Sequence, residues 1–160
     1  MKIKQIRLES FKSFRQPLDI KGLTPGLNIF AGPNASGKTT LATAFRAVFV
    51  ERHKSKMETF APDSDMTVSP SITLDFENNG DTYHLLKRFN KRQTCNLNIN
   101  GVEQDGDLAE ATLTEFLGFS HSGAGQNKDK NLGIPGLLWI SQGHDHEIGE
   151  AVEYAKSHLQ

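Results

Sequence analysis

Residues 27–39 read Leu-Asn-Ile-Phe-Ala-Gly-Pro-Asn-Ala-Ser-Gly-Lys-Thr, and this stretch decides the fold. Its last eight residues make the complete Gly-x-x-x-x-Gly-Lys-Thr pattern of a phosphate-binding loop. Residues 27–31 form a short apolar run, as expected of a strand buried inside a sheet. Beyond the loop, apolar residues recur at helical spacing as far as about Arg52. The sequence therefore predicts a strand, a glycine-rich loop and a helix in that order.

The loop offers the donors that the phosphates of a nucleotide need. Glycines allow a tight turn whose backbone amides point inward at a helix N-terminus. The ammonium of Lys38 can reach the β- and γ-phosphates, and the hydroxyl of Thr39 is positioned to ligate Mg²⁺. We therefore predict a site for ATP and Mg²⁺ whose binding residues are Gly32, Pro33, Asn34, Ala35, Ser36, Gly37, Lys38, Thr39 and Thr40.

Composition narrows the class of protein but not its partners. The chain has 160 residues, enough for one domain with a sizeable core, and its net charge of -1 gives no global attraction to nucleic acid or to an acidic membrane. A single cysteine, Cys95, cannot form an internal disulfide, and no apolar run is long enough to cross a bilayer. We expect a cytoplasmic protein with no membrane partner.

The rest of the chain predicts an α/β fold. Residues 3–8 and 17–20 are patterned as two opening strands, and residues 72–77 and 82–89 alternate around an Asn-Gly hairpin signal. Another strand precedes a second Asn-Gly pair, and a helix capped by Asp107 runs to Gly118. We expect a mixed sheet around the phosphate loop plus a small antiparallel sheet, joined by irregular connections at residues 54–70 and 120–135.

Two other nucleotide-binding classes fit less well. Guanine-specific proteins use Asn-Lys-x-Asp, and residues 90–93 and 127–130 are only near misses. Small-molecule kinases of this type continue with parallel strands and an arginine-bearing lid, whereas hairpin signals follow here. These patterns favour an ATPase.

Three motifs resemble the N-terminal half of the SMC and SbcC-type DNA-repair ATPases, an ABC-type branch that includes RecF and OLD-type proteins. They are Phe-Lys-Ser-Phe at residues 11–14, Gly-Pro-Asn-x-Ser-Gly-Lys in the loop, and Leu-Trp-Ile-Ser-Gln-Gly at residues 138–143. The resemblance implies that Gln142 contacts Mg²⁺ and acts with Lys38 in catalysis, and that Lys12 and Ser13 lie near the nucleotide. It also implies a lobe over residues 1–147 and, at 148–160, the start of a helix leading into a coiled coil.

The sequence departs from that family in ways that affect its predicted activity. Ala35 stands where SMC proteins usually have glycine, and Thr39 replaces the commoner serine. Neither an apolar run ending in Asp-Glu nor a Ser-Gly-Gly signature follows Gln142. The resemblance implies that a C-terminal lobe and a second copy supply these groups, so this chain alone should bind ATP with little hydrolysis.

The implied role is DNA repair, chromosome organisation or phage defence, with DNA as a partner of the full-length protein. The alternative is a nucleotide-gated DNA-binding module of RecF or OLD type with little turnover. Residues 87–92 carry four cations and an aromatic, which is a candidate DNA contact, although a solvated turn is the favoured interpretation. Residues 144–147 read His-Asp-His-Glu, but their spacing fits no zinc pattern and predicts a polar connection.

Overall fold

The computed structural model describes residues 1–118, and residues 119–160 lie outside the described part. The chain divides into two units, Met1–Glu110 and Ala111–Gln160. The strands are β1 (Lys2–Glu9), β2 (Leu18–Lys21), β3 (Ser71–Asn78), β4 (Asp81–Arg88), β5 (Thr94–Ile99) and β6 (Val102–Asp105). The helices are α1 (Lys38–Val50), the short 3-10 helices η1 (Glu58–Phe60) and η2 (Pro62–Ser64), and α2 (Gly106–Leu117), whose first residues belong to the first unit.

The first unit is built on one six-stranded sheet in the order β2-β1-β3-β4-β5-β6, with every neighbouring pair antiparallel. The β3–β4 and β5–β6 hairpins turn at the two Asn-Gly pairs, where Asn79, Gly80, Asn100 and Gly101 all have positive φ. Consecutive positive φ values at Asn-Gly are the geometry of the hairpin turn that those residues predict. Both hairpins are therefore confirmed.

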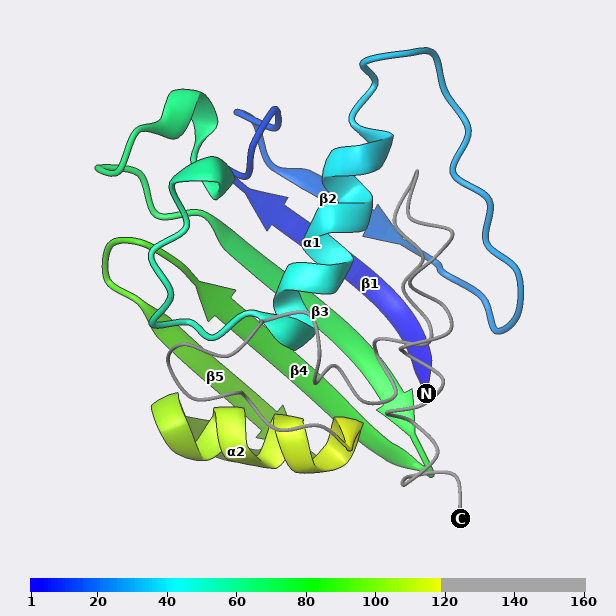
Figure 1. Cartoon of the computed structure of the whole chain (residues 1–160). Coiled ribbons are helices and arrows are strands. Elements are labelled where there is room, and N and C mark those ends of the chain that lie inside the picture. The colour runs from blue at the N-terminus through cyan, green and yellow to red at the C-terminus, as the bar shows by residue number, and fades with distance from the viewer. Residues whose placement is uncertain (119–160) are drawn as a thin grey trace, which may run out of the picture. The chain divides into compact units, whose positions relative to one another are not determined.

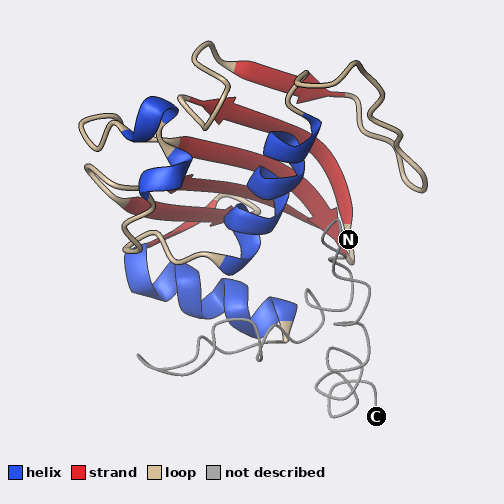
Figure 2. Ribbon diagram, turned by 45° about the horizontal axis from the view of Figure 1, so that its top comes forward, coloured by secondary structure: helices blue, strands red, loops and turns tan. Residues whose placement is uncertain are grey.

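Helix α1 lies across one face of the sheet, as Figures 1 and 2 show. Its buried residues, Leu41, Ala44, Ala47, Val48 and Phe49, recur at helical spacing and confirm the apolar stripe read from the sequence. Phe49 meets Phe76 of β3 edge to face, with ring centroids 6.1 Å apart. The core of this unit therefore lies between α1 and the inward-facing residues of the central strands, and it fixes the helix that follows the phosphate loop.

The sheet differs from the expected one in two ways: the strand expected at residues 27–31 is absent, and the two expected sheets are a single sheet. The strand pairs join the opening strands and the hairpins into a single sheet. Residues 27–31 form no strand, and Leu27 and Ile29 are 84% and 78% exposed. A strand needs a neighbour to pair its backbone groups, and none of the strands in the described part lies beside this run. The apolar pattern therefore marks a segment that lies outside the sheet with most of its side chains exposed.

The connection between α1 and β3 is anchored by an aromatic cluster of Phe11, Phe60 and Phe89. Phe60 lies 4.9 Å from Phe11 and 5.2 Å from Phe89 between ring centroids, and all three residues are buried. Because Phe11 lies between β1 and β2, its packing on Phe60 holds that turn against the connection.

None of the helices in the described residues is long and apolar enough to cross a membrane.

Candidate nucleotide-binding site

The predicted phosphate loop ends at the N-terminus of α1. Gly37 is the residue before the helix and has φ 89, in the left-handed region that favours glycine. Gly32 is crowded instead, because a Cβ there would lie 2.8 Å from the Oγ of Ser36. Residues 31–36 are exposed. The loop is therefore an open turn at a helix N-terminus, where backbone amides and the helix dipole favour an anion.

The ammonium of Lys38 is directed back over the loop. It donates to the carbonyl oxygens of Gly32 at 2.8 Å and Pro33 at 2.7 Å. Both acceptors are neutral, and none of the ion pairs given for the described residues uses Lys38. The positive charge is thus held within the loop without a carboxylate to neutralise it, as a phosphate site requires.

The turn between β1 and β2 packs directly on the loop. Phe14 lies so close to Gly37 that a Cβ at Gly37 would be 2.4 Å from the ring's Cζ atom. The hydroxyl of Ser13 lies 3.1 Å from that of Thr40 in the first turn of α1, and the backbone amide of Lys12 donates to Phe60 at 2.7 Å. The structure therefore brings Ser13 and Phe14 to the loop and the start of α1, whereas the contact of Lys12 is with Phe60.

Phe14 is the residue that sequence reasoning missed. The Phe-Lys-Ser-Phe motif drew attention to Lys12 and Ser13, yet the second phenylalanine is the one that fills the space left by Gly37. The motif itself carried the signal, because an exposed turn seldom needs two aromatics. Whether Lys12 and Ser13 contact a nucleotide stays a prediction.

The donors of the loop fit ATP with Mg²⁺. A Cβ at Gly32 would meet Ser36 Oγ and a Cβ at Gly37 would meet the ring of Phe14, so the tight turn requires glycine at both positions. Thr39, the predicted magnesium ligand, is exposed at the start of α1. Gln142 lies outside the described residues, and so does the predicted helix at 148–160.

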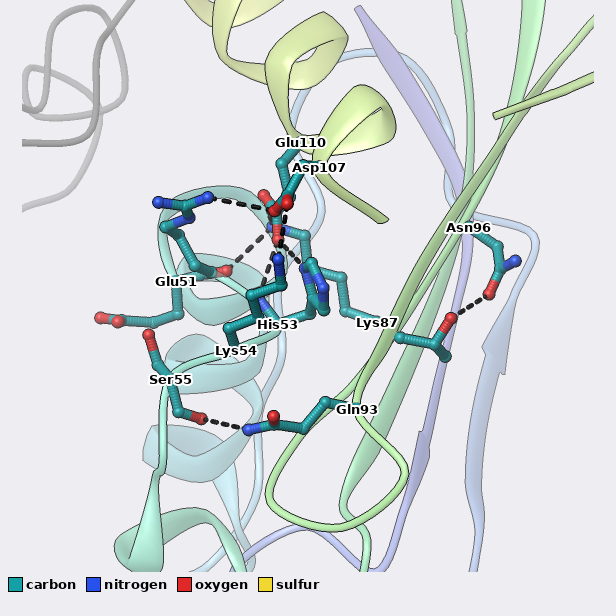
Figure 3. Close-up of polar contacts among 11 residues, drawn as sticks. Glu51, His53, Lys54, Ser55, Lys87, Gln93, Asn96, Asp107 and Glu110 are labelled. Atoms are coloured by element: carbon teal, nitrogen blue, oxygen red, sulfur yellow. Dashed lines mark hydrogen bonds and ion pairs between the residues drawn. The ribbon is translucent and has the colours of Figure 1, made fainter. Parts of the chain in front are cut away.

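The basic hairpin at residues 87–92 is not the uniform cationic surface that its sequence suggests. Lys87 is 0% exposed and its ammonium donates to Glu110 Oε2 and to the Glu51 carbonyl oxygen, both at 2.9 Å (Figure 3). Phe89 is also buried, which leaves Lys91 and Arg92 exposed at the tip. Lys87 is buried and paired with Glu110, so it is not available to contact DNA.

Glu110 holds two further groups in the same buried region. Its Oε1 atom accepts from the backbone amide of His53 at 2.8 Å and lies 3.0 Å from His53 Nδ1. Cys95 of β5 is buried nearby, and desolvation raises the pKa of its thiol to about 12. We call His53, Lys87, Cys95 and Glu110 the buried polar cluster.

Comparison with known proteins places the fold and the loop in a family. A family model described as an AAA domain, AAA_23, matches residues 5–135. The chain belongs to this AAA domain family. The matched range contains strands β2 to β6, most of β1, helix α1 and the whole phosphate loop.

Individual relatives point to SMC-type ATPases. The chromosome partition protein Smc of Rhodopseudomonas palustris (strain ATCC BAA-98 / CGA009) is 45% identical over 56 residues, which cover 34% of this chain and 5% of that protein. A solved chain from work on ATP-driven dimerization and DNA stimulated activation of SMC ATPases has a TM-score of 0.56 at 13% identity. That match covers 95% of this AAA domain and 99% of the other chain, and it shows the shared fold.

A second solved structure, the SMC head domain of Thermotoga maritima, is 25% identical with a TM-score of 0.44 over 77% of this chain and 44% of that one. The family match places the chain among AAA domains, and the chain shares its fold with the solved SMC ATPase chain. Its α/β fold class is therefore confirmed. The chain spans only 5% of the length of the curated relative that it matches.

Proposed function

We propose that this AAA domain binds ATP with Mg²⁺ through residues 32–40, with Lys38 at the β- and γ-phosphates and Thr39 on the metal. The observation that carries the proposal is the open loop at the N-terminus of α1, with Gly37 left-handed and the Lys38 ammonium held over neutral carbonyls. These are the donors and the charge that a nucleoside triphosphate requires.

Hydrolysis requires groups beyond this loop. We place Gln142 at the metal and the attacking water, and we assign the remaining catalytic groups to a C-terminal lobe and to a second copy of the protein. The exposed apolar residues at 27–31 support a missing neighbour, since an extended apolar run is stable when other strands cover it. Positioning of water and stabilisation of transition-state charge dominate phosphoryl transfer, so this lobe alone turns over little ATP.

A Lys38→Ala variant tests the binding proposal. Charge-assisted hydrogen bonds contribute about 1.5–3 kcal/mol, so its Kd for Mg·ATP should rise about 10- to 150-fold in isothermal titration calorimetry. Lys91→Ala, which removes an exposed lysine far along the chain from the loop, is the matched control and should bind like the parent protein. Equal affinity in all three proteins would show that the loop does not hold the phosphates.

The nucleotide-gated DNA-binding module is the second candidate. Lys91 and Arg92, exposed at the tip of the hairpin, favour it because exposed cations are suited to the phosphates of DNA. In the full-length protein, loss of the acidic catalytic residue with ATP still bound should abolish function if turnover drives it. Function that survives that change but not Lys38→Ala would favour occupancy over turnover.

A further inference from the structure

Three residues of types that bind transition metals meet inside the first unit. His53 comes from the segment after α1, Cys95 from β5 and Glu110 from the second turn of α2, and all three are buried. One ligand atom from each lies within 4.8 Å of the other two. Figure 3 shows the His53 and Glu110 side chains pointing toward each other, with Lys87 beside them.

The separations are close to those of a zinc site. With Zn–N near 2.0–2.1 Å, Zn–S near 2.3 Å and tetrahedral angles, neighbouring ligand atoms are about 3.4–3.6 Å apart. His53 Nδ1 and Glu110 Oε1 are 3.0 Å apart, and the widest separation in the set is at most 4.8 Å. Movements of about 1 Å, within the reach of side-chain rotation, would therefore bring all three ligand atoms to bonding distance.

Metal binding would exchange one of the contacts that Glu110 makes now. Lys87 holds Glu110 through Oε2, whereas the metal would take Oε1, which accepts from the His53 backbone amide and would give up its contact with His53 Nδ1. On binding, the Cys95 thiol proton passes to solvent as the sulfur bonds the metal, and the neutral imidazole of His53, whose Nδ1–H now faces the Glu110 carboxylate, carries its proton on Nε2 instead. Glu110 and the thiolate then contribute two negative charges against the dication.

We infer that His53, Cys95 and Glu110 form a binding site for one thiophilic divalent transition-metal ion of the Zn²⁺ class. The thiol and imidazole ligands distinguish it from the oxygen-only magnesium position at the phosphate loop. A metal there would tie the end of α1 to β5 and to the start of α2. We assign the ion a structural role because all three ligands are buried, and a water molecule would complete its four-coordinate shell.

Cobalt(II) provides a direct test, because Cys95 is the only cysteine of the chain and a cobalt–thiolate charge-transfer band can therefore report no other residue. The metal-free full chain should develop this band with one equivalent of Co²⁺, and Cys95→Ser should abolish it. His53→Gln should weaken binding at least tenfold. His84→Gln, which changes an exposed histidine paired with Asp75 on β3, is the matched control and should bind normally.

Two results would overturn the inference. The first is a folded chain that gives no thiolate band with excess Co²⁺, and the second is a band that persists undiminished in His53→Gln. Residues 144–147 also contain histidines, so a His144→Gln/His146→Gln variant must retain the band. Loss of the band in that variant would mean that His144 and His146, and not His53 and Glu110, complete the site with Cys95.

Thermal unfolding with Zn²⁺ supplies a second measurement. At a free concentration one hundred times Kd, zinc should increase the ratio of folded to unfolded protein about 100-fold, and it should have no such effect on Cys95→Ser. Lys87→Met removes a cation next to the dication, so zinc should bind this variant more tightly than the parent protein. An unchanged zinc affinity in Lys87→Met would contradict the site.

Discussion

Replacing Lys87 by Met should destabilise the fold far more than loss of any exposed lysine. Lys87 is 0% exposed, and its ammonium is the cation that pairs with Glu110, itself 2% exposed. Removing one partner of a buried ion pair leaves an uncompensated charge and costs about 3–5 kcal/mol. The total stability of a domain is only about 5–15 kcal/mol, so this single change should remove a large part of it.

A double-mutant cycle separates the ion pair from the packing around it. Glu110→Gln should also cost about 3–5 kcal/mol, because the ammonium then stays buried without its partner. In Lys87→Met/Glu110→Gln no charge remains, and the amide oxygen of the new glutamine side chain can still accept from His53. The remaining cost is the Glu51 carbonyl without its donor, about 1–3 kcal/mol. The two changes should therefore be coupled by at least about 3 kcal/mol.

Urea unfolding followed by circular dichroism measures the cycle, with a chelator present so that no metal can replace Lys87. Lys91→Met is the control and should shift stability by less than about 0.5 kcal/mol. If Lys87→Met is too unstable to fold, a cooperative unfolding transition in the double variant would still show that the two residues are coupled. Strictly additive costs, or a loss of less than about 1 kcal/mol in Lys87→Met, would refute the burial argument.

Three further outcomes follow from the structure. Gly37→Ala places a Cβ 2.4 Å from the ring of Phe14 and should lower ATP affinity at least tenfold. The control is Gly22→Ala, where the backbone is also left-handed but nothing lies within 4 Å, and it should leave ATP affinity unchanged. Equal effects of the two changes would mean that the Phe14 contact is irrelevant to the loop. Ser13→Ala loses a hydroxyl contact with α1 that is worth about 1 kcal/mol, so calorimetry should give an ATP Kd about fivefold higher. Folding raises the pKa of Cys95 from 9.0 to about 12, so its stabilising effect is complete below pH 9 and is lost as the pH rises from there toward 12. Across that window, the free energy of unfolding of the parent protein should fall by about 1.4 kcal/mol per pH unit relative to that of Cys95→Val. The same pH dependence in both proteins would contradict the raised pKa of Cys95.

The local parts of the fold were predictable because their signals are local. The Asn-Gly pairs fixed two hairpins, and apolar spacing placed α1 and α2 close to their observed bounds. The phosphate loop was predicted from one motif between a strand and a helix, of which the structure contains the helix but not the strand. Its catalytic roles and Gln142 remain predictions.

The buried ion pair could not be read from the sequence as a pair. Lys87 and Glu110 are 23 residues apart, and no local pattern joins them. Part of the signal was present, because Leu85, Lys87 and Phe89 alternate and so share the inward face of β4. Lys87 was predicted to lie at the surface only because residues 87–92 contain four cations. The same reliance on composition made residues 27–31 a buried strand, although burial depends on a neighbour that the described part does not contain.

The uncovered segment before the phosphate loop has a consequence for handling the protein. Leu27, Ile29 and Phe30 are exposed and lie outside every strand of the described part. Exposed apolar residues beside unpaired backbone groups favour pairing between molecules, so this segment favours aggregation as concentration rises. The segment that leads into the phosphate loop is thus also the one that makes the protein prone to self-association.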